Sequence, residues 1–386
     1  MIRRRKQRTL IQLIPERLWV NGPRDNIRHP LALVPYCMVN LQDVFENMKF
    51  ENNDQGMGYN SRVLLVDSTN LFIRSYAAVP SMDDNGNPVG GMIGFLKSLG
   101  LAIRSFKPTR VILVFDGKGG SQRRRKLFPD YKANRKPPVR LNRAYDLTTE
   151  DQEKENMKFQ LITLIEILEC LPVTIFALDH VEADDVIAYL SQLVTLQNGE
   201  SIIYSTDKDF FQLAAPNIKI YNPVKKKTFS EQVILEDYGI HPRHFHFFRA
   251  LNGDKSDNIN GVRGVGEATL KKYIPEIADP SVTIDMNFIQ QKFLDAKKVP
   301  KVIENILNNI PLVERNIQLM NLHEGIMSSD ARLRVANRFN TIVTQINKYA
   351  LTKLLMRHRL LNAFPNYDTW ITQNFINLTR FHNDSV

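Results

Sequence analysis

The feature that most limits how this chain can fold is an alternation of short apolar runs and longer amphipathic stretches between residues 63 and 222. Five runs, rich in β-branched or other apolar side chains, have the length of buried strands: 63–66, 111–115, 173–178, 201–205 and 218–221. Helical patterns lie between some of them, at 90–106, 154–171 and 184–196. The alternation predicts an α/β fold with a mostly parallel central sheet and helices on both faces.

Acidic side chains follow the first four of these runs. Because the carboxyl ends of parallel strands meet at one edge of a sheet, we expect these side chains to gather there. Crowded carboxylates repel one another, and divalent cations with a preference for hard oxygen ligands offset that repulsion. The acids are Asp67, Asp116, Glu182, Asp184, Asp185, Asp207 and Asp209.

Each acid has an ordinary alternative explanation when it is taken alone. An aspartate after a strand is usually a turn or N-cap residue, and Asp184 and Asp185 also suit the first turn of a helix. Capping does not readily explain acids at four successive strand ends. The joint pattern therefore favours a site for two magnesium ions, which activate water and stabilise a leaving oxygen.

Composition limits the partner and the compartment. The chain has 51 Lys and Arg against 41 Asp and Glu, a net charge of +10, which is typical of a protein that binds an acidic polymer such as nucleic acid; on charge alone, a solvated basic surface is an equal alternative. Cys37 and Cys170 are far apart and outside any metal-binding spacing. We therefore expect a cytoplasmic protein without a membrane partner.

The rest of the chain divides into four predicted segments. Residues 1–57, interrupted by prolines, are expected to be a poorly ordered extension, and 58–232 an α/β domain with a basic, polar segment near 122–156 that we call the arch. Residues 233–279 form a compact helical unit with a glycine-rich turn, and 280–386 a helical C-terminal domain. Its expected helices are 288–296, 301–309, 337–361 and 367–375.

Several phrases of the sequence resemble a known family, over roughly residues 62–275. They are Val-Asp-Ser-Thr-Asn-Leu at 66–71, Phe-Asp-Gly-Lys-Gly at 115–119, Pro-Asp-Tyr-Lys-Ala-Asn-Arg at 129–135, Val-Glu-Ala-Asp-Asp at 181–185, Ser-Thr-Asp-Lys-Asp-Phe at 205–210 and Gly-Asp-Lys-Ser-Asp-Asn at 253–258. Together they resemble the structure-specific 5′ nucleases: flap endonucleases, the 5′-nuclease domain of bacterial DNA polymerase I, and a phage ribonuclease H of this PIN-like fold.

The resemblance implies a division of the acids between two Mg²⁺ ions, for which Mn²⁺ would substitute. Asp67, Asp116, Glu182, Asp184 and Asp185 would serve the first ion. The second would be served by Asp207, Asp209, Asp254 and Asp257. Residues 1–57 have no counterpart in the family pattern, and residues after 280 match it weakly.

Basic residues in the same phrases are implied to act on the nucleic acid. Lys132 and Arg135 would contact the scissile phosphate at the base of the arch, and Arg124 matches a further basic family position. Arg74 and Tyr131 would contact DNA. Alternatively, these basic side chains are simply part of a solvated protein surface. For Lys132, which is in register with its neighbours in the phrase, we favour a functional role.

The glycine-rich turn at 261–266 precedes an expected helix. Gly261, Gly264 and Gly266 would let backbone N–H groups approach phosphate, and Lys271 and Lys272 would bind phosphate as well. In the family this is a helix–three-turn–helix element that grips duplex, often with K⁺ on the turn carbonyls. Histidines 241, 244 and 246 suggest zinc, but they lie in an aromatic helical stretch away from the strand ends, so packing is the better explanation.

These observations predict a monomeric 5′-to-3′ exonuclease or flap endonuclease that removes RNA primers and 5′ flaps during DNA replication. Its substrates would be branched, nicked or RNA-primed duplexes, with a single-strand-binding protein or a sliding clamp as candidate partners. A free-standing nuclease without a polymerase suggests a phage source, and a phage-encoded protein would lie in the host cytoplasm. The alternatives are a PIN-type single-strand ribonuclease, which usually lacks the duplex-binding turn, a non-catalytic nucleic-acid binder, and a small-molecule phosphatase.

Overall fold

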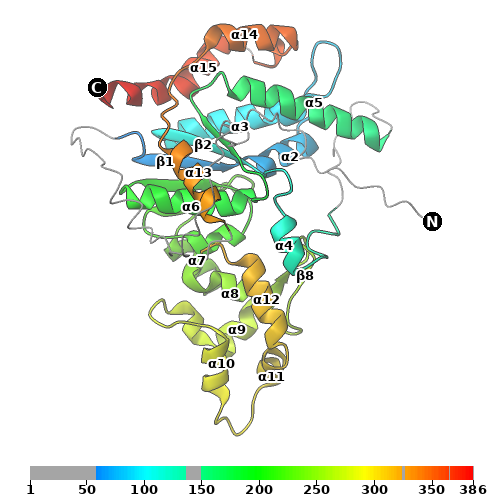
Figure 1. The fold of residues 1–386 in the computed structure, drawn as a ribbon, viewed down its shortest axis with the longest axis vertical. Helices are drawn as coiled ribbons and strands as arrows, with labels where there is room; N and C mark the ends of the chain where they lie inside the picture. The colour runs from blue at the N-terminus through cyan, green and yellow to red at the C-terminus, as the bar shows by residue number, and fades with distance from the viewer. Residues whose placement is uncertain (1–57, 136–148, 324–326, 365, 386) are drawn as a thin grey trace, which may run out of the picture.

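A six-stranded sheet organises the computed structural model, which describes residues 58–135, 149–323, 327–364 and 366–385 (Figure 1). The strand order is β3-β2-β1-β4-β5-β6. Every pairing is parallel except that of β5 with β6. The strands are β1 (Arg62–Asp67), β2 (Arg110–Phe115), β3 (Thr174–Ala177), β4 (Glu200–Tyr204), β5 (Ile218–Asn222) and β6 (Lys227–Phe229). The predicted α/β fold with a mostly parallel sheet is confirmed.

Strand β1 lies at the centre of the sheet and serves two hydrophobic cores. Its side chains alternate between the faces, so Val63 and Leu65 pack into one core while Leu64 and Val66 pack into the other. All four are fully buried. Burial on both faces explains why the sequence here is a continuous apolar run instead of an alternating one.

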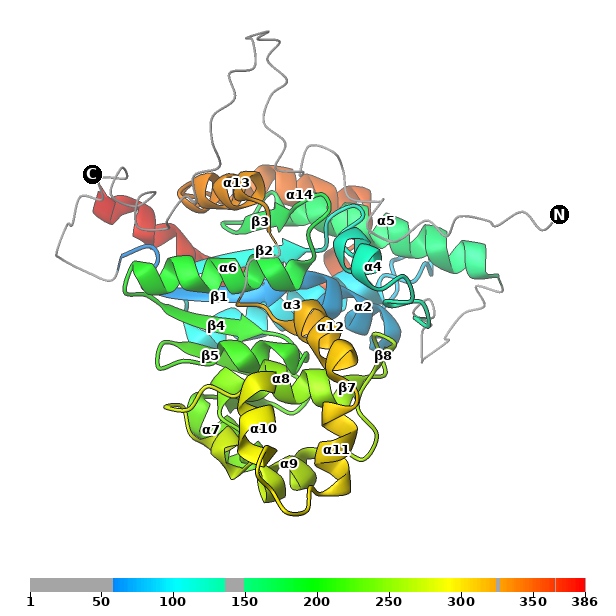
Figure 2. The ribbon, with the colours of Figure 1, turned by 60° about the horizontal axis from the view of Figure 1, so that its bottom comes forward.

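Helices cover both faces of the sheet (Figure 2). Helix α6 (Ala183–Leu196) packs on the face that carries Val63. Helices α2 (Ser68–Ala78), α3 (Gly90–Phe106) and α5 (Glu150–Leu168) supply the core of the other face. A short helix, α4 (Gln122–Leu127), follows β2. The predicted arch falls partly on residues 136–148, outside the described residues.

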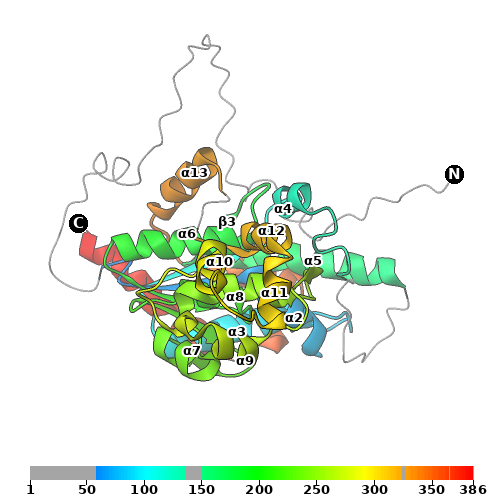
Figure 3. The same cartoon turned by 90° about the horizontal axis from the view of Figure 1, so that it is seen from below.

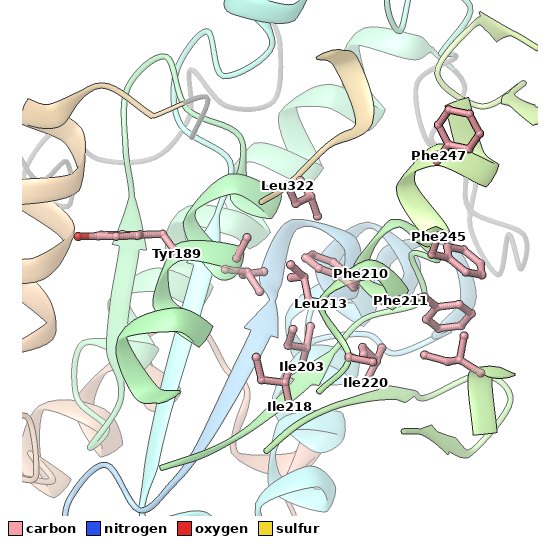
Figure 4. Close-up of a cluster of buried hydrophobic side chains, with 14 of the residues drawn as sticks. Tyr189, Ile203, Phe210, Phe211, Leu213, Ile218, Ile220, Phe245, Phe247 and Leu322 are labelled. Carbon is pink, nitrogen blue, oxygen red and sulfur yellow. The ribbon is translucent and has the colours of Figure 1, made fainter. Parts of the chain in front are cut away.

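The core on the α6 face continues below the sheet through aromatic side chains (Figure 4). Phe210 and Phe211 lie on the 3₁₀ helix η3 (Asp209–Leu213), which follows β4. The ring of Phe211 lies 5.3 Å from that of Phe245 on helix α8 (Pro242–Asn252). This packing fixes the residues after β4 against α8, and both segments contribute to the site.

Below the sheet the chain builds a helical unit that Figure 3 brings to the front. It contains α7 (Glu231–Tyr238), α8, the hairpin β7 (Gly253–Asp254) and β8 (Ile259–Asn260), α9 (Glu267–Tyr273) and the 3₁₀ helix η4 (Pro275–Ala278). Helices α10 (Met286–Phe293), α11 (Lys301–Leu307) and α12 (Ile310–Met320) follow, and α12 packs back on α8. The glycine-rich turn joins β8 to α9.

The last helices return to the sheet. Helix α13 (Ser329–Phe339) packs on α6, α14 (Lys348–Arg357) on α5, and α15 (Tyr367–Phe375) on α3 (Figure 1). The 3₁₀ helices η5 (Leu361–Ala363) and η6 (Ile376–Ser385) accompany them. Helices after residue 280 thus share both cores with the earlier part of the chain. The boundaries of the predicted domains stay a prediction.

The structure differs from the expectations of the sequence in one predicted helix and in elements that were not predicted. The single helix expected over 337–361 is wrong, because the chain leaves helical structure between α13 and α14 and crosses from one face of the sheet to the other. Helices α2 and α12 and the antiparallel strand β6 were not expected. Each of these elements is short, and its apolar side chains are buried only through tertiary packing. No helix in the described ranges is long and apolar enough to cross a bilayer.

Candidate active site

The candidate site lies where the connections of the sheet change direction. From β1 the chain proceeds to β2 and β3 on one side, and β4 and β5 then extend the sheet on the other side of β1. In open parallel sheets, ligands bind at the carboxyl ends of the strands at such a switch point. A cleft of about 480 Å³ opens there. It is lined by Asp67, Thr69, Asn70, Ile73, Arg74, Asp116, Lys132, Arg135, Asp184, Thr206, Asp207, Lys208, Arg249, Asp254, Ser256 and Asp257.

Asp67 ends β1 and caps helix α2. One carboxylate oxygen accepts the backbone N–H of Asn70 at 3.2 Å, and the other accepts the hydroxyl of Ser205 at 2.8 Å. Burial and the nearby Asp116 raise the pKa of Asp67 to about 6. The side chain is therefore fixed in direction by the strand end and is short of positive charge.

Asp116 follows β2 and joins two neighbouring connections. Its backbone N–H donates to the Thr69 hydroxyl at 2.9 Å, and its carboxylate accepts the backbone N–H of Ala183 at 2.9 Å. These bonds tie the end of β2 to the start of α2 on one side and to the first turn of α6 on the other. The sheet edge thereby fixes Asp116 close to the acids on α6.

Five acids at the ends of β1 to β3 form what we call the first acid group: Asp67, Asp116, Glu182, Asp184 and Asp185. Within it, Glu182 and Asp185 are buried against the guanidinium of Arg124, itself only 4% exposed. Arg124 contacts Glu182 and binds both oxygens of Asp185, at 2.8 and 2.9 Å. Burial alone would raise the pKa of Glu182, but Lys132 and Arg124 outweigh it and hold that pKa at about 2.

Four acids on the other side of the cleft form what we call the second acid group: Asp207, Asp209, Asp254 and Asp257. Asp207 follows β4, Asp209 begins η3, and the other two lie on the hairpin after α8. Arg249, on the last turn of α8, contacts Asp209 at 2.6 Å through Nε and contacts Asp254 through Nη2. Its side chain is 12% exposed.

The residues after α4 are attached to the hairpin of the second acid group. The backbone N–H of Lys132 donates to the carbonyl of Asp257 at 2.9 Å, and Arg135 pairs with the Asp257 carboxylate. Lys132 has a left-handed φ of 57°, which is unusual for a residue with a side chain. This backbone directs its ammonium group toward Glu182, so Lys132 links the two acid groups.

Not every residue predicted to act on nucleic acid is accessible. Arg74 lines the cleft and forms no ion pair with the described residues, and Arg135 is exposed. Arg124 is enclosed, where it also donates to the carbonyl of Leu319 at 2.8 Å. Tyr131 is 3% exposed and packs beside Leu319, so this conformation leaves its ring little surface for DNA.

The residues of the cleft are suited to divalent cations, although their side chains are not arranged as a complete set of metal ligands. Among the described residues, no three Asp, Glu, His or Cys side chains converge in a metal-binding arrangement. Arginine and lysine groups contact several of the same carboxylates instead. Four acids around the cleft have no such cation within the described ranges: Asp67, Asp116, Asp184 and Asp207. The carboxylate oxygens of these four acids are hard donors of the kind that Mg²⁺ prefers.

The glycines of the turn are required for different reasons. Gly264 has a φ of 82°, which disfavours any side chain, and a Cβ on Gly261 would lie 2.3 Å from the backbone of Asn252. At Gly266 the backbone is ordinary extended chain, and a Cβ would meet none of the described residues within 4 Å. Gly266 therefore has no internal packing reason to be glycine. On α9, Lys271 pairs with Glu267, and the ammonium of Lys272 lies over the Tyr273 ring.

Sequence reasoning missed Arg249, Ser205 and Thr69. The sequence contains a signal for Arg249, because it is a single cation within the apolar stretch 247–251, four residues before Gly253 and five before Asp254. No comparable signal marks the two hydroxyls, whose contacts join elements far apart in sequence. The histidines 241, 244 and 246 serve packing and capping; His241 caps α8 and His244 bonds to the carbonyl of Asp279.

The fold and the site define a class of α/β protein. Its cleft lies at the switch point of the sheet, is lined by acids and has basic side chains at its rim. The family model described as the 5′-3′ exonuclease, N-terminal resolvase-like domain, matches residues 62–239. The 5′-3′ exonuclease of Aquifex aeolicus is 32% identical over 214 residues, 54% of this chain and 68% of that protein. That of Buchnera aphidicola is 30% identical over 286 residues, 72% of this chain and 87% of that protein.

The chain belongs to the 5′-3′ exonuclease family of structure-specific 5′ nucleases. It is thus a nuclease, a hydrolase with 5′-3′ exonuclease activity.

Solved structures agree on the fold. A bacteriophage T5 flap endonuclease, solved in complex with DNA and metal ions, is similar with a TM-score of 0.53 and 22% identity. The match covers 78% of this chain and 98% of that one. By sequence, the thermostable DNA polymerase I of Thermus thermophilus is also similar: it is 34% identical over 216 residues, 56% of this chain but 24% of that longer protein. The recognition of the family from sequence phrases is confirmed.

Proposed function

We propose that this 5′-3′ exonuclease cuts branched, nicked and RNA-primed duplexes with two divalent cations, and that it removes 5′ flaps and RNA primers during replication. The observation that supports this most is one cleft lined by six acids, with cations on its rim. Carboxylates alone would repel a polyanion. Cations on the rim offset that repulsion and favour a phosphate close to the acids.

The two acid groups would hold the two ions. The first acid group would bind one Mg²⁺ and the second acid group the other, and Mn²⁺ would substitute because it has similar oxygen preferences. When bound, such ions supply charge stabilisation and a water of lowered pKa for phosphodiester hydrolysis. The protein fixes the direction of the carboxylates through bonds such as that from Ser205 to Asp67.

The cations of the cleft divide into two roles. Lys132, Arg135 and Arg74 line the cleft and would contact the phosphate that is cut or its neighbours. Arg124 does not line the cleft and contacts Glu182 and Asp185, so we assign it a positioning role. It would hold these acids in place beneath the cleft while other cations contact the substrate.

The turn between β8 and α9 would bind the uncut duplex. Gly266 leaves open space around an extended backbone, which suits close approach of a phosphate. Lys272 is exposed on the last turn of α9, the helix that follows, and Lys271 is held by Glu267. The proposed K⁺ at residues 261–266 would use backbone carbonyls there. We keep this ion, and Tyr131 as a DNA contact, as parts of the proposal.

The test is digestion of three 5′-labelled substrates, a flap, a nicked duplex and an RNA-primed duplex, with Mg²⁺ or with EDTA, followed by sizing of the products. We expect short 5′ products from all three in Mg²⁺ and none in EDTA. A free single strand should be cut more slowly, since it does not engage the turn. Equal cleavage of single strands would favour the single-strand ribonuclease alternative, and cleavage in EDTA would contradict the metal site.

A further inference from the structure

Arg249 contacts two of the four acids of the second acid group. It lies on the last turn of α8, where a positive charge is also favoured by the helix dipole. Its Nε contacts Oδ1 of Asp209 at 2.6 Å, and its Nη2 contacts Oδ2 of Asp254. The same side chain lines the cleft. One guanidinium therefore bridges two acids that come from different elements, η3 and the hairpin after α8.

The hydrogen bonds of Asp254 indicate which of its two carboxylate oxygens is available to a ligand. Oδ1 of Asp254 accepts both the backbone N–H and the hydroxyl of Ser256, each at 2.7 Å. Oδ2 is therefore the oxygen of this carboxylate best placed to bind a ligand, and Arg249 contacts that atom. A divalent cation coordinated by Oδ2 requires a position close to the carboxylate, because Mg²⁺ binds oxygen at about 2.0–2.1 Å. A guanidinium group at the same oxygen would occupy that position.

The first acid group provides a contrast within the same cleft. Its buried counter-ion, Arg124, is 4% exposed, does not line the cleft and donates to a backbone carbonyl as well. Its other cation, Lys132, lines the cleft but contacts Glu182, which does not line it. The acids of that group that do line the cleft, Asp67, Asp116 and Asp184, form no ion pair with the described residues. Arg124 therefore leaves the cleft-facing oxygens of the first acid group open, whereas Arg249 contacts Oδ2 of Asp254, an acid that lines the cleft.

We propose that Arg249 is an exchangeable counter-ion of the second acid group: it positions Asp209 and Asp254, and a divalent cation that binds them must displace its guanidinium. This inference rests on the proposed two-ion function and goes beyond it, because it assigns a specific competitor to the second ion. Arg249 would thereby set the concentration of divalent cation at which the second ion binds.

The test is a calorimetric titration of the full chain with Mn²⁺, in the wild type, Arg249→Gln and Arg249→Lys. The second binding step is identified as the step that Asp254→Asn removes. Without the competitor, Arg249→Gln should tighten that step by about tenfold or more, which corresponds to ~1.4 kcal/mol. Arg249→Lys should tighten it less, since an ammonium group retains the charge but cannot bridge both carboxylates in the same way.

Thermal melting gives a second readout that does not depend on activity. In EDTA, Arg249→Gln should melt at a lower temperature than the wild type, because two acids lose their counter-ion. Mn²⁺ should then raise its melting temperature by more than it raises that of the wild type. The matched control is Arg243→Gln on the same helix, whose exposed side chain contacts the carbonyl of Pro280 at 2.8 Å. It should change neither the second step nor the response to Mn²⁺.

The outcomes separate the two proposals. If Mn²⁺ does not bind the wild type, the two-ion function and this inference both fail. If Mn²⁺ binds in two steps and Arg249→Gln weakens the second step or leaves it unchanged, only the inference fails, and Arg249 is a fixed support for the acids. A second step of intermediate affinity in Arg249→Lys would show that displacement of the cation, not a change in folding, explains the effect.

Discussion

The two acid groups of the cleft are built differently, although they face the same space. The first acid group is carried by the ends of parallel strands and by the first turn of α6, and its counter-ion Arg124 is enclosed. The second is carried mostly by η3 and a two-stranded hairpin, and its counter-ion Arg249 lines the cleft. A sheet edge fixes side chains through many backbone bonds, whereas the hairpin depends on a few side-chain contacts. We infer that the first acid group is the more rigid of the two.

The largest expected effect is the abolition of chemistry by a change in either group. Asp116→Ala and Asp207→Ala should each abolish cleavage of the labelled flap, because each removes an acid without a counter-ion among the described residues. DNA affinity, measured by fluorescence anisotropy in Ca²⁺, should hold or rise because repulsion of the phosphates is relieved. Near-normal cleavage by both variants would contradict the assignment of the two acid groups to two metal ions.

The next effect is on stability and sharpens the contrast between the counter-ions. Arg124→Gln should reduce the free energy of unfolding by about 3–5 kcal/mol, since it leaves Glu182 and Asp185 buried without that cation. Arg249→Gln should cost less, because its acids can gain water from the cleft. Chemical denaturation in EDTA measures both. Arg125→Gln, an exposed position on the same short helix as Arg124, is the control and should unfold like the wild type.

Equal decreases in stability for Arg124→Gln and Arg249→Gln would contradict the proposed difference in rigidity. A decrease for Arg125→Gln would point instead to a general role of the basic surface of α4.

Lys132 tests whether the two groups act on one phosphate, because it lies between them. Lys132→Ala should lower turnover by roughly 10²–10³-fold, the effect of one preorganised electrostatic group, with a much smaller change in affinity. Single-turnover cleavage combined with binding in Ca²⁺ separates the two quantities. Weaker affinity at unchanged turnover would make Lys132 an ordinary phosphate anchor.

The smallest expected effect concerns the duplex-binding turn, away from both groups. Gly266→Ala adds a methyl group where no atom of the described part of the chain lies within 4 Å, so folding should be unaffected while phosphate approach is hindered. Duplex affinity should fall several-fold. The slope of log affinity against log salt should flatten by about 0.9 for each phosphate that the turn no longer neutralises. Cleavage of single strands should change little.

Gly264→Ala serves as the contrasting variant, because its φ of 82° strains any side chain. It should lower the melting temperature and activity on every substrate in proportion. If Gly266→Ala behaves in the same way, the turn is a structural cap and does not bind the duplex.

Much of the first acid group was predictable from the sequence, and less of the second. The strands that precede Asp67, Asp116 and Glu182 are buried on both faces, so their apolar runs are continuous and easily recognised. The fold class and the family phrases follow from the same runs. Asp254 and Asp257 were associated with the site through the resemblance alone, because no strand-end argument brings residues 254 and 257 to the sheet edge.

The sequence by itself determined which chemistry is present: the order of strands and helices, acids placed after successive strands, and a basic phrase at 129–135. Only the tertiary structure decided which cation faces which acid. Helix α8 packs against η3 and so brings Arg249 to Asp209, 40 positions earlier, while Arg124 points inward and Lys132 reaches across. The physical reason is that strand and helix patterns depend on local periodicity, whereas ion pairs within 4 Å depend on how separate elements pack.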